Sequence, residues 1–371
     1  MAASSPVSGG GSAAARPAVV HLGPDPGGGG GMAAVIRALF ASPLRERYEM
    51  SMIVTHRAVG PLRRLWVFAR VLPPLLAWAL RRGPRLAHVH SAARGSLYRK
   101  SFLVLLLRAL RRPVLVQIHA GPVDMEEFAG RIGKLQRAFI GFGLRAATRV
   151  AAVSSATATT TERCFGISGV VVVPNPAPTL PPGARPLEPG GGAEPRVLFL
   201  GGFANPVKGG EVMVAAAAML APKQPQATFA LAGPGEAPPT LVELGRNEAN
   251  VEWLGWLDEE AKQRELGRSA VFVLPSISEG LPVALLEAMS WGRAIVATRM
   301  GGVPDVVNDD REAVLVPAGD PAALADAIDR LLDDPERCRR LGSAARQRAG
   351  TLNDEDVCGR LDRLYREALG E

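Results

Sequence analysis

Two carboxylates, those of Glu279 and Glu287, flank a predicted helix start in the second half of the chain. An apolar run before them predicts a short buried strand. Pro282 suits the first helical position because its fixed φ and missing N–H cost nothing there, which places Glu279 on the strand-to-helix loop. The amides of Gly280 and Leu281 then point out of the helix start and favour an anion. The two carboxylates can accept hydrogen bonds from hydroxyl groups, and the neighbouring anion site can bind phosphate. A ligand that carries both kinds of group, such as a nucleotide sugar, suits this arrangement.

The spacing of these glutamates resembles the Glu-x7-Glu motif of the retaining glycosyltransferases of family 4, which have the GT-B fold. Other motifs of that family occur here in the same order. They are Trp253–Leu257, Val273–Ser276, Glu287–Met289, Ala294–Thr298, Gly301–Asp305 and Val316–Asp320. The alternative, a surface helix with two solvated glutamates, leaves this ordered set unexplained. The resemblance implies two Rossmann-like domains that face each other across a cleft, with a C-terminal helix crossing back to the first domain.

The resemblance also implies separate roles for the two glutamates. Glu287 would accept hydrogen bonds from ribose hydroxyls, and Glu279 would hold hydroxyls of the transferred sugar. Neither is expected to be a covalent nucleophile, because the acceptor attacks the face from which the diphosphate departs. Preorganised donors on the leaving phosphate then carry most of the catalysis. Glycosidases differ, since their carboxylate pair brackets the bond as acid and base or nucleophile.

Lys208 lies in a glycine-rich segment that resembles the family's Gly-Arg…Lys-Gly sequence, in which both cations hold the donor diphosphate. Lys208 matches the lysine and is predicted to be catalytic. Gly202 or Phe203 stands where the family has arginine. The missing charge must therefore come from elsewhere, and the candidates are the helix-start amides, Arg94 and Arg99.

By the same resemblance, the first half of the chain contributes Gly30, Gly31 and His119 to the cleft. The strand Ala18–Leu22, a glycine run and a helix form the opening of a Rossmann-type domain. Gly30 and Gly31 match the glycine pair that faces donor and acceptor. His119 matches the family's His-Gly, although Ala120 is inserted, and is predicted to face the sugar. The alternative is a hydrogen-bonded histidine at a strand end.

The stretch from His88 to Lys100 resembles a subgroup that builds cell-surface polysaccharides. Ser96, Arg99 and Lys100 could bind an anionic acceptor there, or they could form a solvated basic helix start. His88 and His90 alternate on a strand without a carboxylate partner, so no metal site is predicted.

No metal and no cofactor are expected at the donor site, where the nucleotide sugar is a co-substrate. Many transferases hold a metal with an Asp-x-Asp pair. The acidic pairs of this chain fall late, in polar stretches outside the motif core: Asp309-Asp310, Asp333-Asp334 and Asp354–Asp356. The sequence therefore predicts a metal-independent reaction.

Strands and helices alternate along the chain, which predicts α/β domains with parallel sheets covered by helices. The predicted strands are Ala18–Leu22, Met50–Val54, Leu86–His90, Val114–Ile118, Arg149–Val153, Val170–Val173, Arg196–Leu200, Ala227–Ala232, Val251–Leu254, Val271–Leu274, Ala294–Ala297 and Ala313–Val316. Leu62–Arg82 and Phe128–Thr148 are predicted as helices that combine an apolar face with basic residues.

Composition shifts give the domain limits. We expect a disordered tail over 1–16, an acceptor-side domain over 17–178, a Pro/Gly-rich linker over 179–195, a nucleotide-sugar domain over 196–350 and a C-terminal helix over 351–371 that packs on the first domain. Asn175 ends a strand at the hinge, where a turn role is expected.

The 371 residues are 47% hydrophobic, as in a globular protein, and the three scattered cysteines fit a reducing cytosol. No secretory signal is visible, and the apolar stretches fall short of the ~20 residues that span a bilayer. The net charge of +7 is concentrated in the first half. Nucleic acid is not a predicted partner, because no nucleic-acid motif is present and aromatic residues are only 5%. Two interpretations of this charge stay open: a cytoplasmic protein that is peripheral on the anionic inner face of the plasma membrane, or a charge that serves solubility.

The sequence thus favours a retaining, hexosyltransferase-type enzyme (EC 2.4). It would move a sugar from a nucleotide-diphosphate sugar to a lipid-linked or glycan acceptor in cell-surface polysaccharide or glycoconjugate biosynthesis. Two alternatives stay open: a nucleotide-sugar 2-epimerase of GT-B fold, and a non-catalytic subunit that binds glycan or donor. The base, sugar, acceptor, linkage and oligomeric state cannot be read from the sequence.

Overall fold

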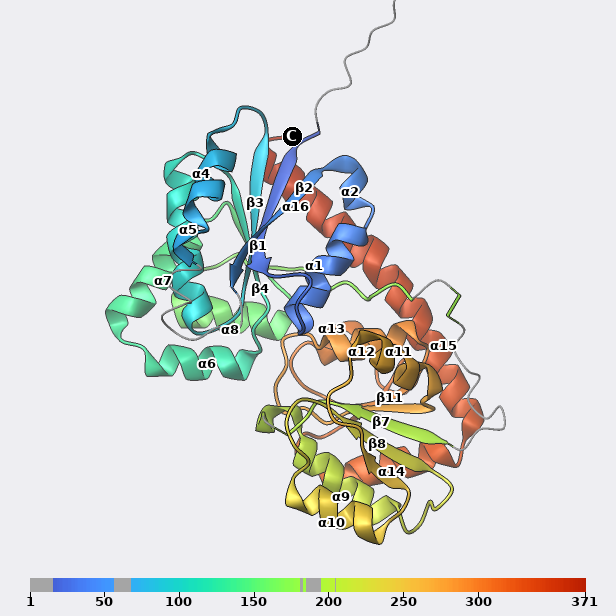
Figure 1. The fold of residues 1–371 in the computed structure, drawn as a ribbon. Helices are drawn as coiled ribbons and strands as arrows, with labels where there is room; N and C mark the ends of the chain where they lie inside the picture. Colours follow the sequence, from blue (N-terminus) through green and yellow to red (C-terminus); the bar gives the residue numbers. More distant parts are fainter. Residues whose placement is uncertain (1–15, 57–67, 181–182, 185–194, 204) are drawn as a thin grey trace, which may run out of the picture.

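Two α/β domains, one above the other in Figure 1, make up the structure. The computed structural model describes residues 16–56, 68–180, 183–184, 195–203 and 205–371. Most of the predicted tail and most of the predicted linker lie outside these ranges. Each domain is built on a parallel six-stranded sheet, in the order β2-β1-β3-β4-β5-β6 in the first and β12-β11-β10-β7-β8-β9 in the second. The predicted fold class is confirmed.

All twelve predicted strands are present, with ends that differ from the prediction by two residues at most. They are β1 (Ala18–Pro24), β2 (Glu49–His56), β3 (Arg85–Ser91), β4 (Val114–Ile118), β5 (Arg149–Ala152), β6 (Val171–Val172), β7 (Arg196–Leu200), β8 (Thr228–Ala232), β9 (Val251–Trp253), β10 (Val271–Leu274), β11 (Ala294–Thr298) and β12 (Val314–Val316). Parallel strands covered on both faces are continuous apolar runs, which is why the sequence located them.

Helices cover both faces of each sheet (Figure 1). In the first domain they are α1 (Gly31–Ala41), α2 (Leu44–Arg47), α4 (Leu72–Leu80), α5 (Gly95–Ala109), α6 (Pro122–Arg131), α7 (Lys134–Ala146) and α8 (Ser155–Phe165). The second domain has a 3-10 turn (Pro206–Lys208), α9 (Gly210–Leu220), α10 (Pro239–Asn247), α11 (Glu259–Arg268), α12 (Val283–Ser290), α13 (Val303–Val306), α14 (Pro321–Leu332) and α15 (Pro335–Thr351). A π-helical segment, Leu352–Gly359, leads into α16 (Arg360–Leu369).

Two helix predictions are wrong in their extent. The predicted single helix Phe128–Thr148 is divided into α6 and α7. The division falls where Gly133 donates its N–H to the side chain of Gln136 at 2.9 Å and so starts a new helix. Of the predicted Leu62–Arg82 helix, α4 forms the later part, and residues 62–67 lie outside the described ranges.

The end of the chain joins the two domains. α15 packs against α12 in the second domain, and α16 continues across to β3 and β4 of the first sheet (Figure 1). There the carboxylate of Asp362 accepts hydrogen bonds from Tyr48 at 2.9 Å and from Arg47 at 2.8 Å. The predicted crossing of the C-terminal helix is therefore present.

Candidate functional site

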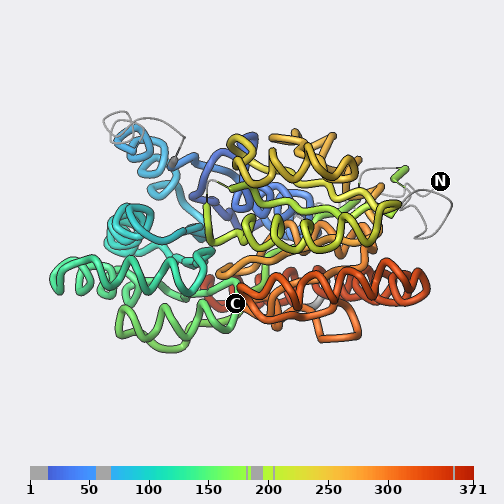
Figure 2. Tube along the Cα trace, turned by 90° about the horizontal axis from the view of Figure 1, so that it is seen from below, coloured from blue at the N-terminus to red at the C-terminus, as the bar shows by residue number. Residues whose placement is uncertain are grey.

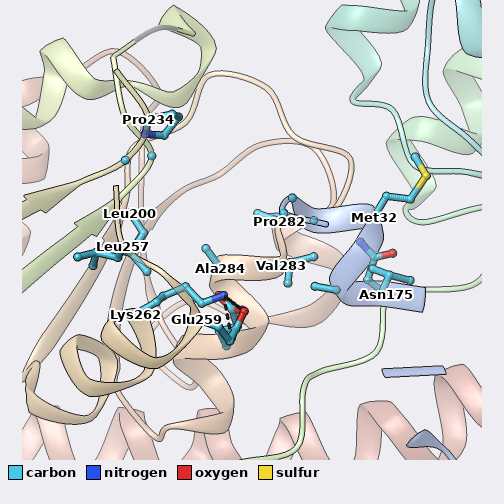
Figure 3. Close-up of a pocket in the computed structure, with 18 of the residues that line it drawn as sticks. Met32, Asn175, Leu200, Pro234, Leu257, Glu259, Lys262, Pro282, Val283 and Ala284 are labelled. Atoms are coloured by element: carbon cyan, nitrogen blue, oxygen red, sulfur yellow. Dashed lines mark hydrogen bonds and ion pairs between the residues drawn. The ribbon is translucent and has the colours of Figure 1, made fainter. Parts of the chain in front are cut away.

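A cavity of about 890 Å³ lies between the two domains. Its walls are loops that follow strands of both sheets, which is where open α/β sheets bind ligands. Figure 3 shows Met32 and Asn175 on the first-domain side, opposite Lys262, Leu257 and Pro234 of the second domain. All eight predicted site residues line this one cavity, namely Gly30, Gly31, His119, Lys208, Glu279, Gly280, Leu281 and Glu287.

Lys208 and Glu279 form an ion pair at the cavity wall. The Lys208 Nζ lies 2.6 Å from Oε1 of Glu279, and the hydroxyl of Ser276 donates to the same oxygen at 3.1 Å. The Glu279 side chain is 12% exposed and that of Lys208 is 35% exposed. The half-exposed Lys208 ammonium has further N–H donors, so an anionic ligand can bind it and weaken its pairing with Glu279, which makes this carboxylate more available to other donors.

The Glu279 loop is held by close backbone contacts. Gly301 has φ +53°, and a Cβ atom there would stand 1.9 Å from the carbonyl oxygen of Glu279. A Cβ on Gly280 would lie 3.0 Å from the carbonyl oxygen of His119, so the loop touches the first domain. Among the described residues, the N–H groups of Gly280 and Leu281 have no hydrogen-bond acceptor, which leaves them available to an anion.

Glu287 makes the second ion pair of the cavity. Its side chain is 5% exposed, and its Oε1 lies 2.5 Å from the Nζ of Lys262 on α11. Burial raises the pKa of Glu287, whereas the Lys262 ammonium acts to lower it. Lys262 also lies 3.1 Å from the carboxylate of Glu259, which is 3.5 Å from the guanidinium of Arg37 on α1. Pro282 is the N-cap of α12, one residue before its predicted position.

The cations of the cavity differ from those that the sequence suggested. Arg94 and Arg99 do not line it, and Arg94 lies 3.6 Å from the carboxylate of Asp124. Its lining includes the predicted Lys208 and, in place of the two arginines, Lys262 and Arg37. Sequence reasoning missed Lys262 because its helix and that of Glu287 are brought together only by packing.

Lys100 fits neither of its predicted roles, which were acceptor binding and part of a solvated basic helix start. Its side chain is buried, and its ammonium donates to the carbonyl oxygen of Leu22 at 2.9 Å and to the hydroxyl of Thr55. Burial holds the pKa of Lys100 well below its usual value. The hypothesis that this side chain binds an anionic acceptor at the surface is therefore wrong.

His119 borders the cavity with both ring nitrogens already paired. Nδ1 lies 3.2 Å from Oδ1 of Asn175, and Nε2 lies 3.0 Å from Nδ1 of His90. Burial lowers the pKa of His119 to about 4, so the ring is neutral at pH 7. Asn175 also donates its Nδ2 to the carbonyl oxygen of Leu281 at 2.8 Å, so it joins the two domains rather than only forming a turn.

Family models match both halves of the chain. The model described as Glycosyltransferase Family 4 matches residues 33–179, and the model described as Glycosyl transferases group 1 matches residues 194–334. The chain is 29% identical, over 84% of its length, to 74% of the 2-deoxystreptamine N-acetyl-D-glucosaminyltransferase of Streptomyces fradiae. It is 33% identical, over 47% of its length, to the alpha-D-kanosaminyltransferase of Streptomyces kanamyceticus, of which it covers 46%. It thus spans less than half the length of several curated relatives that it matches.

Solved structures share the whole architecture. Sucrose-phosphate synthase from Thermosynechococcus elongatus superposes with a TM-score of 0.71 over 96% of this chain and 100% of that one, at 21% identity. HepE from Anabaena, solved in complex with UDP, gives a TM-score of 0.68 over 95% of this chain and 99% of that one, at 18% identity. These likenesses support the two-domain fold described above.

Proposed function

We infer that this chain is a glycosyltransferase of the GT-B fold, and we propose that it transfers a sugar from a nucleotide-diphosphate sugar with retention of configuration. The observation that carries the proposal is the cavity, where a lysine and two unpaired amides adjoin two carboxylates. The lysine and the amides suit a diphosphate, and the carboxylates suit the hydroxyls of ribose and sugar. The complexes of HepE with UDP and with UDP-glucose support a donor of this class.

The ion pairs suggest how a donor would enter. The diphosphate would bind the Lys208 ammonium and the amides of Gly280 and Leu281. This contact would weaken the ion pair between Lys208 and Glu279. Glu279 then accepts hydrogen bonds from hydroxyls of the sugar, while Glu287 accepts those of the ribose. The acceptor approaches from the side of Gly30 and Gly31, and the leaving phosphate takes its proton. Charge then develops where the lysine and the amides are already aimed.

Products formed from the donor alone would separate this proposal from its alternatives. Purified protein with a bound nucleotide sugar but no acceptor is expected to release nucleoside diphosphate and a sugar of unchanged anomeric configuration, slowly, with water as acceptor. An epimerised nucleotide sugar would instead identify a 2-epimerase. Binding without any turnover, in the presence of glycan and lipid-linked acceptors, would identify a non-catalytic subunit.

Lys262 is expected to contribute to donor binding rather than to the chemical step. Lys262→Met keeps the length of the side chain but leaves Glu287 buried without a cation. The cost should be about 1.5–3 kcal/mol of donor affinity, the value of a charged hydrogen bond. Steady-state kinetics should show a higher KM for the donor and a nearly unchanged kcat, because the ribose is remote from the breaking bond. A fall in kcat at constant KM would contradict this role.

We further propose a lipid-linked or glycan acceptor at the cytoplasmic membrane face, as in polysaccharide biosynthesis. No helix among the described residues is long and apolar enough to cross a bilayer. α7 lies at the outer edge of the first domain in both views (Figure 2). Its Leu135 and Phe142 are 87% and 58% exposed, and Lys134 stands beside them. An apolar surface with basic neighbours suits an anionic interface.

Vesicle binding tests this surface. The double variant Leu135→Ser/Phe142→Ser should cosediment far less than wild type with anionic vesicles at low salt. Met219→Ser, which removes an exposed apolar side chain from α9 in the second domain, is the matched control and should bind normally. Added salt should weaken binding of the wild type. Equal cosedimentation of all three proteins would reject α7 as the membrane contact.

A further inference from the structure

Four of the five histidines of the chain gather on one face of the first sheet. In the strand register, His21 of β1 stands opposite His88 of β3, and His90 stands opposite Gln117 of β4. His119 follows β4. The first three histidines are fully buried or nearly so, and His119 borders the cavity.

The hydrogen bonds of these rings have a single consistent direction. The amide of Asn175 is oriented because its Nδ2 donates to Leu281, so its Oδ1 must accept from Nδ1–H of His119. A neutral His119 therefore carries a lone pair on Nε2, which accepts from Nδ1–H of His90. Nε2 of His90 in turn accepts from Nδ1–H of His21 at 3.0 Å. We call Asn175, His119, His90 and His21 the histidine chain.

His88 lies beside the histidine chain but belongs to a separate branch. Its Nε2–H donates to Oε1 of Gln117 at 3.1 Å, and its Nδ1 accepts from the hydroxyl of Tyr365 on α16 at 2.7 Å. His21, His88 and His90 are close enough to suggest a metal site. However, five of their six ring nitrogens are hydrogen-bonded, and among the described residues only Nε2 of His21 is unpartnered. The geometry therefore favours a network over a metal centre.

The surroundings keep the rings neutral. Burial lowers the pKa of His21 to about 3 and that of His119 to about 4, and the pKa of His90 lies well below its usual value. Lys100 of α5 acts on His90 in the same direction. Tyr365 faces His88 from α16, and Lys208 and Glu279 line the cavity that His119 borders.

We propose that His90 and His21 are positioning residues for the donor site, because with Asn175 they hold His119 in the Nδ1–H tautomer. His119 then donates to Asn175, which in turn holds the Leu281 loop, and its only lone pair is occupied by His90, so it cannot remove the proton of an acceptor. Only the effect on sugar transfer rests on the proposed function. The tautomers can be measured on the protein without donor or acceptor.

The test is a long-range ¹H–¹⁵N spectrum of the full chain with labelled histidine at pH 7, assigned with single His→Gln variants. We expect His21, His90 and His119 as Nδ1–H tautomers, which are the minority form in water, and His88 as Nε2–H. An Nε2–H form or a cationic ring at His90 or His119 would overturn the proposal. Zinc chloride should leave the ring signals unchanged, and simultaneous shifts of His21, His88 and His90 would show a metal site instead.

Kinetics distinguish positioning from a merely structural role. His90→Leu removes the donor to Nε2 of His119, so kcat should fall about tenfold, the equivalent of one hydrogen bond. Burial still lowers the pKa of His119 in this variant, but loss of the hydrogen bond to its neutral Nε2 lets that pKa rise, so the acid limb of the kcat profile should move to higher pH. His90→Gln, which can donate and accept, should restore activity, and His88→Gln is the control from the other branch. An unshifted pH profile in folded His90→Leu would refute the positioning role.

Discussion

Glu279→Gln and Glu287→Gln should each fold like the wild type and lose sugar transfer by roughly 10- to 150-fold, the equivalent of about 1.5–3 kcal/mol for one charged hydrogen bond. The physical reason differs between them. In Glu279→Gln the new amide would still fill the place beside Ser276 but could not accept strongly from a sugar hydroxyl. At position 287 the substitution removes the charge that pairs with Lys262 at 2.5 Å and that would bind the ribose. Initial rates of nucleoside diphosphate release measure both effects.

A matched control exists outside the cavity. The side chain of Glu265 is 12% exposed, as is that of Glu279, and it lies 2.7 Å from the guanidinium of Arg196. Glu265→Gln should therefore disturb folding as much as Glu279→Gln does, while leaving the activity of the folded protein intact. Full activity of both cavity variants would reject the assignment of Glu279 and Glu287 to donor binding, regardless of the result for Glu265→Gln.

Lys208→Ala is expected to raise the KM for the donor and to lower kcat by about 10²–10³-fold, the cost of removing one donor to the developing charge. The kcat effect follows if the ammonium binds the leaving diphosphate more tightly in the transition state than in the ground state. Lys223→Ala, which truncates an exposed lysine, should have no effect. A fully active Lys208→Ala would place the phosphate site elsewhere.

The same account proposes that no metal ion takes part. In this account Lys208 and the amides of Gly280 and Leu281 would bind the diphosphate, and Lys262 and Arg37 add positive charge to the cavity wall. Activity should therefore survive dialysis against EDTA. Loss of activity in EDTA with rescue by Mn²⁺ or Mg²⁺ would contradict this part of the proposal without affecting the assignment of Glu287.

The sequence predicted most of the fold because its signals are local. β4 and β10 are apolar runs whose limits were predicted without error, and the ordered motifs from Trp253 to Asp320 carried the family resemblance that implied a cleft between two domains. The break before α7 was missed because one glycine N–H bonded to Gln136 decides it, and no change in hydrophobic periodicity accompanies it.

What the sequence could not supply depends on long-range packing. His21 and His88 become neighbours only through the pairing of β1 with β3. Lys262 reaches Glu287 only because α11 packs beside α12. The contact of Asn175 with Leu281 requires the two domains to be placed together. Spacing along the chain carries no information about any of these three contacts.

Binding of nucleoside diphosphates tests the central claim most directly, because it requires neither the acceptor nor the sugar to be known. A ligand that binds only the folded state stabilises it by about 2.7 kcal/mol at a hundredfold excess over Kd. We predict that UDP, GDP or ADP raises the Tm of the wild-type protein by several degrees in the presence of EDTA, and that Glu287→Gln loses most of this shift. No stabilisation of the wild type by any of the three nucleotides, or an equal shift in Glu287→Gln, would contradict the account.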